Sequence, residues 1–308
     1  MLPLVTAIVP SYNYARFVVR AVESCLEQTF PSLEVLVVDD ASTDGSRELL
    51  QARFSGDPRV RLHLASENAG VSGNFNRGLK LARGRYVAFC CADDAWEPDH
   101  LATVVPALER SGDAVLAYAR AHLLNETGAP VEDDDGCGFG SCEDALFFER
   151  LVRGANFVPF VATVFRRQEA LDAGGFNPRI QVMQVYDLWL RLAATRPVVH
   201  VASATVRVSW HGANASARGA RTSLKRKRDA VAIFEGLLER ELPLLRERGL
   251  ERAARGRLAD ALSRLARRTP SREEARACSL RALRLAPFSA SSYLGYVRAL
   301  VPWRGAAT

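Results

Sequence analysis

The stretch that most constrains the fold is a run of four apolar residues, Val35 to Val38, which ends abruptly in the pair Asp39-Asp40. A short apolar run without alternation indicates a strand buried on both faces, as in a parallel sheet. Acids at the exit of such a strand are expected at the carboxyl edge of the sheet, where open α/β folds bind ligands. A second run, Arg85 to Ala92, shows the same pattern of an apolar strand followed by two acids, here Asp93-Asp94. Side by side, the two strands would gather up to four carboxylates over one crevice, which suits a cation and polar hydroxyls.

Strand and helix signals alternate along the first 112 residues. Apolar runs predict strands at residues 4–9, 33–39, 60–64 and 87–91, with helical periodicity between them. This order predicts an α/β fold with a doubly wound, mostly parallel sheet. Residues 113–221 mix strands, helices and polar loops, and the pattern is helical from residue 222 onward. We therefore expect a domain over 1–221, with halves at 1–112 and 113–221, and an all-helical extension over 222–308.

The composition is typical of a globular protein, because 48% of the residues are apolar. No apolar run approaches the roughly 18 residues that span a bilayer. The first residues are already strand-like and lack the basic region of a signal peptide. The six cysteines are therefore expected to be reduced thiols. These observations predict a cytoplasmic protein.

The charge is distributed unevenly along the chain. Residues 222–308 hold 19 of the 41 basic residues and 9 of the 35 acidic ones, so this extension carries +10 and the remainder −4. A basic helical extension suits peripheral contact with the anionic inner face of the cytoplasmic membrane. The alternatives are a solvated helical face and plain packing against the rest of the chain. Binding of nucleic acid is not expected, because the basic segment lacks interleaved aromatic residues.

Six short motifs, in order over residues 3–216, resemble those of the family-2 glycosyltransferases. They are Val9-Pro-Ser-Tyr-Asn13, Gln28-Thr-Phe-Pro31, the segment Val37–Gly45, Arg83-Gly-Arg-Tyr86, Ala92-Asp-Asp94 and Leu188-Trp-Leu-Arg-Leu192. Each motif alone is a weak indication of this family, whereas the six together in this order are specific to it. The resemblance implies the GT-A fold, a Rossmann-like nucleotide half joined to a mixed acceptor half. It also implies an inverting transferase that uses a nucleoside-diphosphate sugar, such as a UDP-sugar, and a divalent cation, Mn²⁺ or Mg²⁺.

The resemblance also implies roles for individual residues. Asp94 is the expected metal ligand, Asp93 is expected to hold a ribose hydroxyl, and Asp40 is expected to accept the uracil N–H. The backbone of Pro10, Ser11 and Tyr12 is expected to line the base pocket, Asn68 either braces its loop or contacts the nucleotide, and His211 is a candidate ligand of the metal or diphosphate. For Asp39 we expect only hydrogen bonds to nearby loop amides, as Asx residues commonly form. The acidic loop residues 132–135 lack the rigid spacing of a metal site.

Two departures from the family pattern bear on catalysis. Cys91 stands where many relatives have the first acid of the metal-binding strand. Some relatives also lack that acid. More seriously, the expected catalytic base falls on Val185, which cannot take a proton. The nearest carboxylate is Asp187, and on a helix two residues correspond to a rotation of about 200°. Either the helix start is rearranged so that Asp187 serves, or the base comes from elsewhere in the chain, or catalysis is lost; we take Asp187 as the candidate base.

The leading prediction is a metal-dependent inverting glycosyltransferase that moves a sugar from a UDP-sugar to a glycan or lipid-linked acceptor in cell-surface polysaccharide biosynthesis. The alternative is a non-catalytic nucleotide-sugar-binding scaffold with the same fold, which Val185 motivates. A Rossmann oxidoreductase is disfavoured because Pro-Ser-Tyr-Asn stands where its glycine-rich turn would be. A sugar-phosphate nucleotidyltransferase would need a glycine-rich basic loop at the same place.

Overall fold

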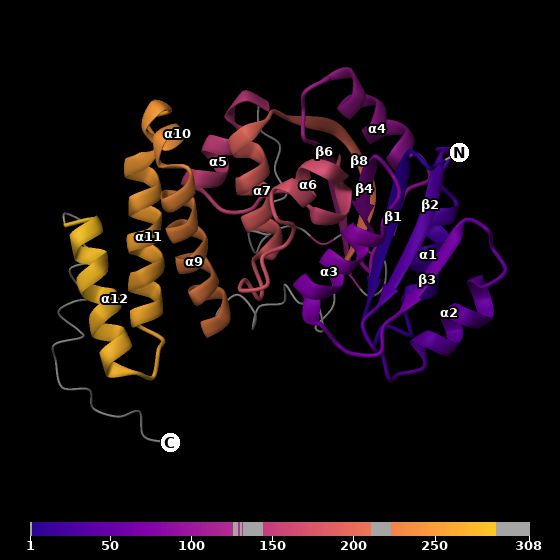
Figure 1. Cartoon of the computed structure of the whole chain (residues 1–308), viewed down its shortest axis with the longest axis horizontal. Helices are drawn as coiled ribbons and strands as arrows, with labels where there is room; N and C mark the ends of the chain where they lie inside the picture. Colours follow the sequence, from indigo (N-terminus) through magenta and orange to yellow (C-terminus); the bar gives the residue numbers. More distant parts are fainter. Residues whose placement is uncertain (1, 126–128, 130, 132–143, 211–222, 288–308) are drawn as a thin grey trace. The chain divides into compact units, whose positions relative to one another are not determined.

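The computed structural model describes residues 2–125, 129, 131, 144–210 and 223–287 (Figure 1). The chain divides into two compact units. The first unit comprises Met1–Phe148, Asn156–Pro178 and Arg191–Asn214, and the second comprises Glu149–Ala155, Arg179–Leu190 and Ala215–Thr308. The second unit therefore joins the C-terminal helices to two short segments from earlier in the chain.

An eight-stranded mixed sheet forms the centre of the first unit, in the order β3-β2-β1-β4-β7-β6-β8-β5. The strands are β1 Val5–Ser11, β2 Leu33–Asp39, β3 Val60–Leu64, β4 Tyr86–Phe89, β5 Ala95–Trp96, β6 Leu116–Asn125, β7 Thr163–Arg166 and β8 Val198–Trp210. Strands β3, β2, β1 and β4 are parallel, as are β6 and β8, whereas β7 and β5 run antiparallel to their neighbours. The predicted strand–helix alternation and α/β class are confirmed.

The two acid-ended strands are not neighbours. Strand β1 lies between β2 and β4, with Ser11 opposite Asp39 on one side and Ile8 opposite Phe89 on the other. The expectation of adjacent strands is therefore wrong, because apolar periodicity identifies a strand but not its neighbour. Two interstrand steps separate β2 from β4, or roughly 10 Å at the usual sheet spacing. The exit of β1 thus lies between the two acidic pairs.

Helices connect the strands of the first unit and bury one apolar stripe each. They are α1 Val18–Leu26, α2 Ser46–Phe54, α3 Gly70–Leu81, α4 His100–Arg110 and α6 Arg167–Asp172, with 3₁₀ turns at Asp144–Leu146 and Phe160–Ala162. On α1 the buried apolar residues recur at three- and four-residue spacing, Val18, Ala21, Val22 and Cys25. Helices α5 Phe147–Arg153 and α7 Gln184–Thr195 contribute residues to both units.

Gly84, which precedes β4, shows why the motif before this strand needs a glycine. A Cβ at this position would lie 2.5 Å from the backbone nitrogen of Thr6, in β1. The Gly84 N–H instead donates a 2.9 Å hydrogen bond to the Thr6 hydroxyl. The absence of a side chain therefore lets the turn enter the sheet directly beside β1.

Four helices follow in the second unit: α9 Leu224–Arg240, α10 Leu242–Glu247, α11 Glu251–Ala266 and α12 Arg272–Leu285. Helix α11 packs beside both α9 and α12 (Figure 1). Serine side chains cap α9 and α12, where Ser223 accepts from the Arg226 N–H and Ser271 from the Glu274 N–H. Within the described part of the chain, no helix combines the length and apolar character needed to cross a bilayer.

His100, at the start of α4, is a fully buried titratable group of the first unit. Its Nδ1 lies 2.8 Å from the Thr205 hydroxyl, and its ring lies 4.8 Å from that of Trp96. Its Nε2 has no hydrogen-bond partner among the described residues. Burial lowers the pKa of His100 from 6.5 to about 3, so the folded protein keeps this ring neutral.

This burial predicts a loss of stability in mild acid. Below pH 6.5 the unfolded chain binds a proton at His100 that the folded chain does not bind, so the free energy of unfolding falls by about 1.4 kcal/mol per pH unit. Denaturant titrations at pH 7, 6 and 5 measure this fall in the free energy of unfolding. Between pH 7 and pH 5, the fall should be about 2 kcal/mol smaller in His100→Asn than in wild type. The exposed His122→Asn is the control and should keep the wild-type slope. An unchanged slope in His100→Asn would contradict the account.

Candidate functional site

The loops that leave β1 and β2 are tied to each other. Asn13 and Ala41 both adopt left-handed backbone conformations, with φ of 58° and 64°. The side-chain oxygen of Asn13 accepts a 2.8 Å hydrogen bond from the Thr43 N–H, and the Asn13 N–H donates to the Ser42 hydroxyl. Asp39 accepts from the Ser42 N–H at 2.9 Å, which confirms its predicted loop-bracing role. These contacts fix the loops at the carboxyl edge of the sheet.

Asp40 is buried at the exit of β2 and holds the start of α3. Its carboxylate accepts 2.9 Å hydrogen bonds from the N–H groups of Ala69 and Gly70 and from the Arg77 guanidinium. Asn68 donates to the Asp40 carbonyl and accepts from the Gly70 N–H. Both side chains therefore brace the loop before α3, and the nucleotide contacts expected of them stay predictions.

The exit of β1 presents a buried hydroxyl and a half-exposed ring. Pro10 lies opposite Val38 in the sheet, and the Asp40 N–H donates to the Ser11 carbonyl. The Ser11 hydroxyl is buried and has no hydrogen-bond partner among the residues that the structure describes. Leaving such a group unpaired is costly, so this hydroxyl suits a bound ligand or water. The Tyr12 side chain, by contrast, is 47% exposed.

Asp93 and Asp94 are buried in the turn between β4 and β5. Asp94 accepts a 2.9 Å hydrogen bond from the Ser209 N–H, in β8. Arg20, on α1, donates to the Asp93 carbonyl at 3.0 Å and to the Ser209 hydroxyl at 2.9 Å. The turn that carries both acids is thus fixed from the helix on one side and from β8 on the other.

The electrostatics of this turn favour a cation. Burial, and next the neighbouring Asp93 charge, raise the pKa of the Asp94 carboxyl well above its usual range. The pKa of the Tyr14 hydroxyl is also raised, mainly by burial and then by the Asp93 charge. Two nearby carboxylates in a buried turn repel each other, and a divalent cation would relieve that repulsion.

The donor set also fits Mg²⁺ or Mn²⁺, which prefer oxygen ligands. Among the described residues, no group of three or more His, Cys, Asp or Glu side chains is placed to hold a metal ion. Asp94 would therefore hold the cation together with oxygens of a bound ligand and with water, as Mg²⁺ sites commonly do, and the charge of the neighbouring Asp93 would add to the attraction. His211 lies outside the described residues, as does the acidic loop at 132–135.

The candidate base lies on α7, within the second unit. Val185, at the position expected for the base, is partly exposed, whereas Asp187 is buried. One carboxylate oxygen of Asp187 lies 3.9 Å from the guanidinium of Arg240, on α9. The side chain of Asp187 is therefore directed toward α9.

Sequence reasoning missed three residues around the acidic turn: Tyr14, Arg20 and Ser209. Arg20 and Ser209 are 189 residues apart, and neither belongs to a motif quoted above. The only local signal was for Tyr14, which follows the first motif directly. Their contacts follow from the sheet order, which brings β8 beside β5.

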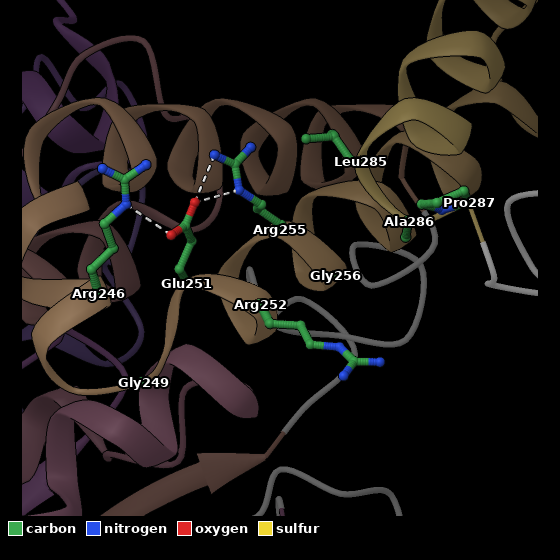
Figure 2. Close-up of a pocket in the computed structure, with 9 residues that line it drawn as sticks. All are labelled: Arg246, Gly249, Glu251, Arg252, Arg255, Gly256, Leu285, Ala286 and Pro287. Atoms are coloured by element: carbon green, nitrogen blue, oxygen red, sulfur yellow. Dashed lines mark hydrogen bonds and ion pairs between the residues drawn. The ribbon is translucent and has the colours of Figure 1, made fainter.

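A pocket of about 660 Å³ lies in the second unit, between the start of α11 and the end of α12 (Figure 2). Arg246 and Arg255 both bind Glu251, and Arg252 extends separately (Figure 2). No residue proposed for the donor or base lines this pocket. We therefore do not assign it to the transfer reaction.

Comparison with known proteins identifies relatives of the chain. Residues 6–153 match the model of glycosyl transferase family 2. The chain is 37% identical over 191 residues to the putative teichuronic acid biosynthesis glycosyltransferase TuaG of Bacillus subtilis, which covers 62% of this chain and 72% of that protein. It is 29% identical over 214 residues to chondroitin synthase of Escherichia coli, which covers 70% of this chain. The chain spans only 30% of that larger relative.

Solved structures share the fold. The 1–349 fragment of S. aureus TarS superposes with a TM-score of 0.67 at 16% identity, over 96% of this chain and 89% of that one. The same fragment has been solved with UDP-GlcNAc, with a TM-score of 0.65. The mannosyltransferase PcManGT of Pyrobaculum calidifontis, solved with GDP-Man and Mn²⁺, gives 0.58 at 21% identity, over 97% of this chain and 86% of that one. These likenesses confirm the predicted GT-A fold with C-terminal helices.

The family match covers residues 6–153, which include every donor-side motif from β1 to Asp94. The 37% identity to TuaG extends over 72% of that glycosyltransferase. This chain belongs to glycosyl transferase family 2.

Proposed function

We propose that this protein is a metal-dependent inverting glycosyltransferase that moves a sugar from a UDP-sugar to a glycan or lipid-linked acceptor in cell-surface polysaccharide biosynthesis. The observation that carries the proposal is the buried Asp93-Asp94 turn at the carboxyl end of β4, in the parallel part of the mixed sheet. The relation to TuaG supports a polysaccharide pathway, and the fold shared with a TarS structure that holds UDP-GlcNAc supports a UDP-sugar donor.

On the donor side, Asp94 would hold Mn²⁺ or Mg²⁺ and Asp93 would accept a ribose hydroxyl. The cation, when bound, neutralises charge on the leaving diphosphate. The unpartnered Ser11 hydroxyl and the backbone of Pro10 and Tyr12 would face the nucleobase. Asp40 and Asn68 would shape the pocket by holding the loop before α3, with Asp40 also reaching the uracil N–H.

His211 is proposed as a further ligand of the metal or diphosphate. It follows Ser209 by two residues, and the Ser209 N–H is bonded to Asp94. Imidazole is a suitable ligand for Mn²⁺ and, when protonated, a donor to phosphate.

On the acceptor side, Asp187 would take the proton of the attacking hydroxyl as its oxygen bonds to the anomeric carbon of the sugar and the bond from that carbon to the diphosphate oxygen breaks, which releases UDP. In the structure one carboxylate oxygen of Asp187 lies 3.9 Å from the Arg240 guanidinium, which is longer than a hydrogen bond. The alternative function is a nucleotide-sugar-binding scaffold without turnover, and the observation that favours it is Val185 at the expected base position.

The donor site predicts that divalent cation and UDP bind together through Asp94. Calorimetry should show that Mn²⁺ tightens UDP binding to wild type by about tenfold or more, which is about 1.4 kcal/mol. Asp94→Asn should lose this gain, because the carboxylate that meets the cation is gone. Asp57→Asn, which removes a surface acid paired with Arg59, should keep it. Equal Mn²⁺ dependence in wild type and Asp94→Asn would remove Asp94 from the metal site.

Substitutions on α7 distinguish the transferase from the non-catalytic scaffold. UDP release from UDP-GlcNAc and UDP-glucose, with Mn²⁺ and chondroitin oligosaccharides as acceptor probe, measures turnover. If Asp187 is the base, Asp187→Asn should lower kcat by roughly 10²–10⁴-fold with the donor KM unchanged. If the chain is an impaired scaffold, wild type should be inactive and Val185→Asp should gain turnover. A wild-type rate that Asp187→Asn leaves unchanged would contradict the role of Asp187.

The second unit also carries a concentrated basic surface, which we propose for peripheral contact with the cytoplasmic membrane. It combines the first turn of α9 with the end of α11 and consists of Lys225, Arg226, Lys227, Arg264, Arg267 and Arg268. Burial, followed by the charges of Arg268, Arg264, Arg226 and Arg267, lowers the pKa of Lys227. Such a concentration of positive charge suits anionic headgroups.

Charge reversal at this basic surface should strongly weaken membrane contact. In sedimentation with phosphatidylglycerol–phosphatidylcholine vesicles, the triple change Lys225→Glu, Arg267→Glu and Arg268→Glu should weaken binding roughly 100-fold or more, since each cation contributes about 1 kcal/mol. The matched control reverses the exposed Lys80, Arg83 and Arg110 of the first unit. Equal losses in both triple variants would indicate a dependence on net charge alone and would count against this surface.

A further inference from the structure

A single buried carboxylate on α9 binds the segment that leads into α7. Asp229 is only 2% exposed. Its Oδ2 accepts hydrogen bonds from the N–H groups of Val182 at 2.6 Å and Met183 at 3.0 Å. Both of its oxygens lie 3.1 Å from the Gln181 nitrogen. Three consecutive backbone donors thus converge on one side chain.

These donors stand directly before the first turn of α7, which begins at Gln184. The Asp187 N–H donates to the Met183 carbonyl at 3.1 Å, so Met183 takes part in the first helical turn. The first N–H groups of a helix have no partners within the helix, and a carboxylate near them is also favoured by the helix dipole. Asp229, on another helix, therefore fixes the three residues that lead into the first turn of α7.

Other contacts of α9 with α7 lie within the same unit. Phe234 packs against Tyr186, with ring centroids 6.3 Å apart, and Arg240 lies 3.9 Å from Asp187. The Tyr186 hydroxyl donates to the Leu151 carbonyl at 2.7 Å. The side chains of Tyr186 and Asp187 are thereby held, while Asp229 sets where the helix begins.

We propose that Asp229 is a positioning residue, which fixes the first turn of α7 so that the acceptor-activating position on this turn is held in place. The inference rests on the proposed transferase function and takes Asp187 to be the catalytic base. Asp229 itself touches neither donor nor acceptor. Its charge-assisted hydrogen bonds to three amides set the direction of the turn.

The substitution Asp229→Asn tests this role with little change in volume. An amide has one acceptor oxygen and no negative charge, so with that oxygen at the Oδ2 position the Gln181 N–H faces an NH₂ group in place of its second acceptor, and the bonds from Val182 and Met183 lose their charge assistance. A small displacement of a catalytic group lowers the rate strongly, by about 10²-fold for 1 Å. We therefore expect kcat to fall by roughly 10- to 100-fold, with the donor KM unchanged, because the donor residues belong to the first unit.

The control is Asp260→Asn on α11, which removes an acid that pairs with the exposed Arg264. Three measurements on the wild-type 308-residue chain and both variants decide the question: steady-state UDP release from UDP-GlcNAc with Mn²⁺ and the same acceptor probe, calorimetric binding of UDP with Mn²⁺, and hydrogen exchange of residues 181–187. Only Asp229→Asn should show faster exchange in this segment together with a lower kcat. Binding of UDP should be equal in all three proteins.

The outcomes separate this inference from the function on which it rests. Unchanged exchange at 181–183 in Asp229→Asn, or faster exchange with an unchanged kcat, would overturn the positioning role. A parallel loss of kcat, UDP binding and global stability would also overturn it, in favour of a purely structural role. A wild type without turnover but with UDP–Mn²⁺ binding would contradict the transferase function and with it the positioning role of Asp229 in catalysis, even if exchange shows that Asp229 holds the turn.

Discussion

Buried carboxylates that accept backbone N–H groups from distant segments are the interaction on which this structure depends. Asp40 binds the start of α3 about 30 residues away, Asp94 binds β8 across 115 residues, and Asp229 binds the entry to α7 across 46 to 48 residues. Burying a charge is unfavourable unless it is paired or hydrogen-bonded. Backbone amides provide that compensation here, and in return each acid fixes a loop that the sheet alone would leave free.

The same principle divides the acids at the sheet edge into two kinds. Asp39 and Asp40 accept hydrogen bonds from loop amides and, for Asp40, from Arg77, so their charge is largely compensated by the protein. Asp93 and Asp94 lie together in a buried turn, and the pKa of Asp94 is raised by burial and by its neighbour. The first pair therefore shapes the site, whereas the second pair is suited to a cation that the protein itself does not provide.

The part of this picture that could be predicted from the sequence depends on short-range chemistry. Apolar runs ending in acids predicted β2 and β4, and the Asx contact of Asp39 was predictable because its partner is three residues away. The insertion of β1 between these strands was not predictable, since periodicity carries no information on strand order. The roles of Arg20, Ser209 and Asp229 were missed for a related reason, because their partners lie 46 to 189 residues away and no motif marks them.

The central claim is that the acidic turn after β4 binds a divalent cation together with the diphosphate of the donor. Anomalous diffraction from crystals grown with UDP and Mn²⁺ tests it most directly, because the metal signal locates the ion without reference to activity. The account predicts one Mn²⁺ peak in coordination contact with both the Asp94 carboxylate and the diphosphate oxygens. A UDP molecule bound elsewhere, or a Mn²⁺ peak that does not touch Asp94, would contradict it.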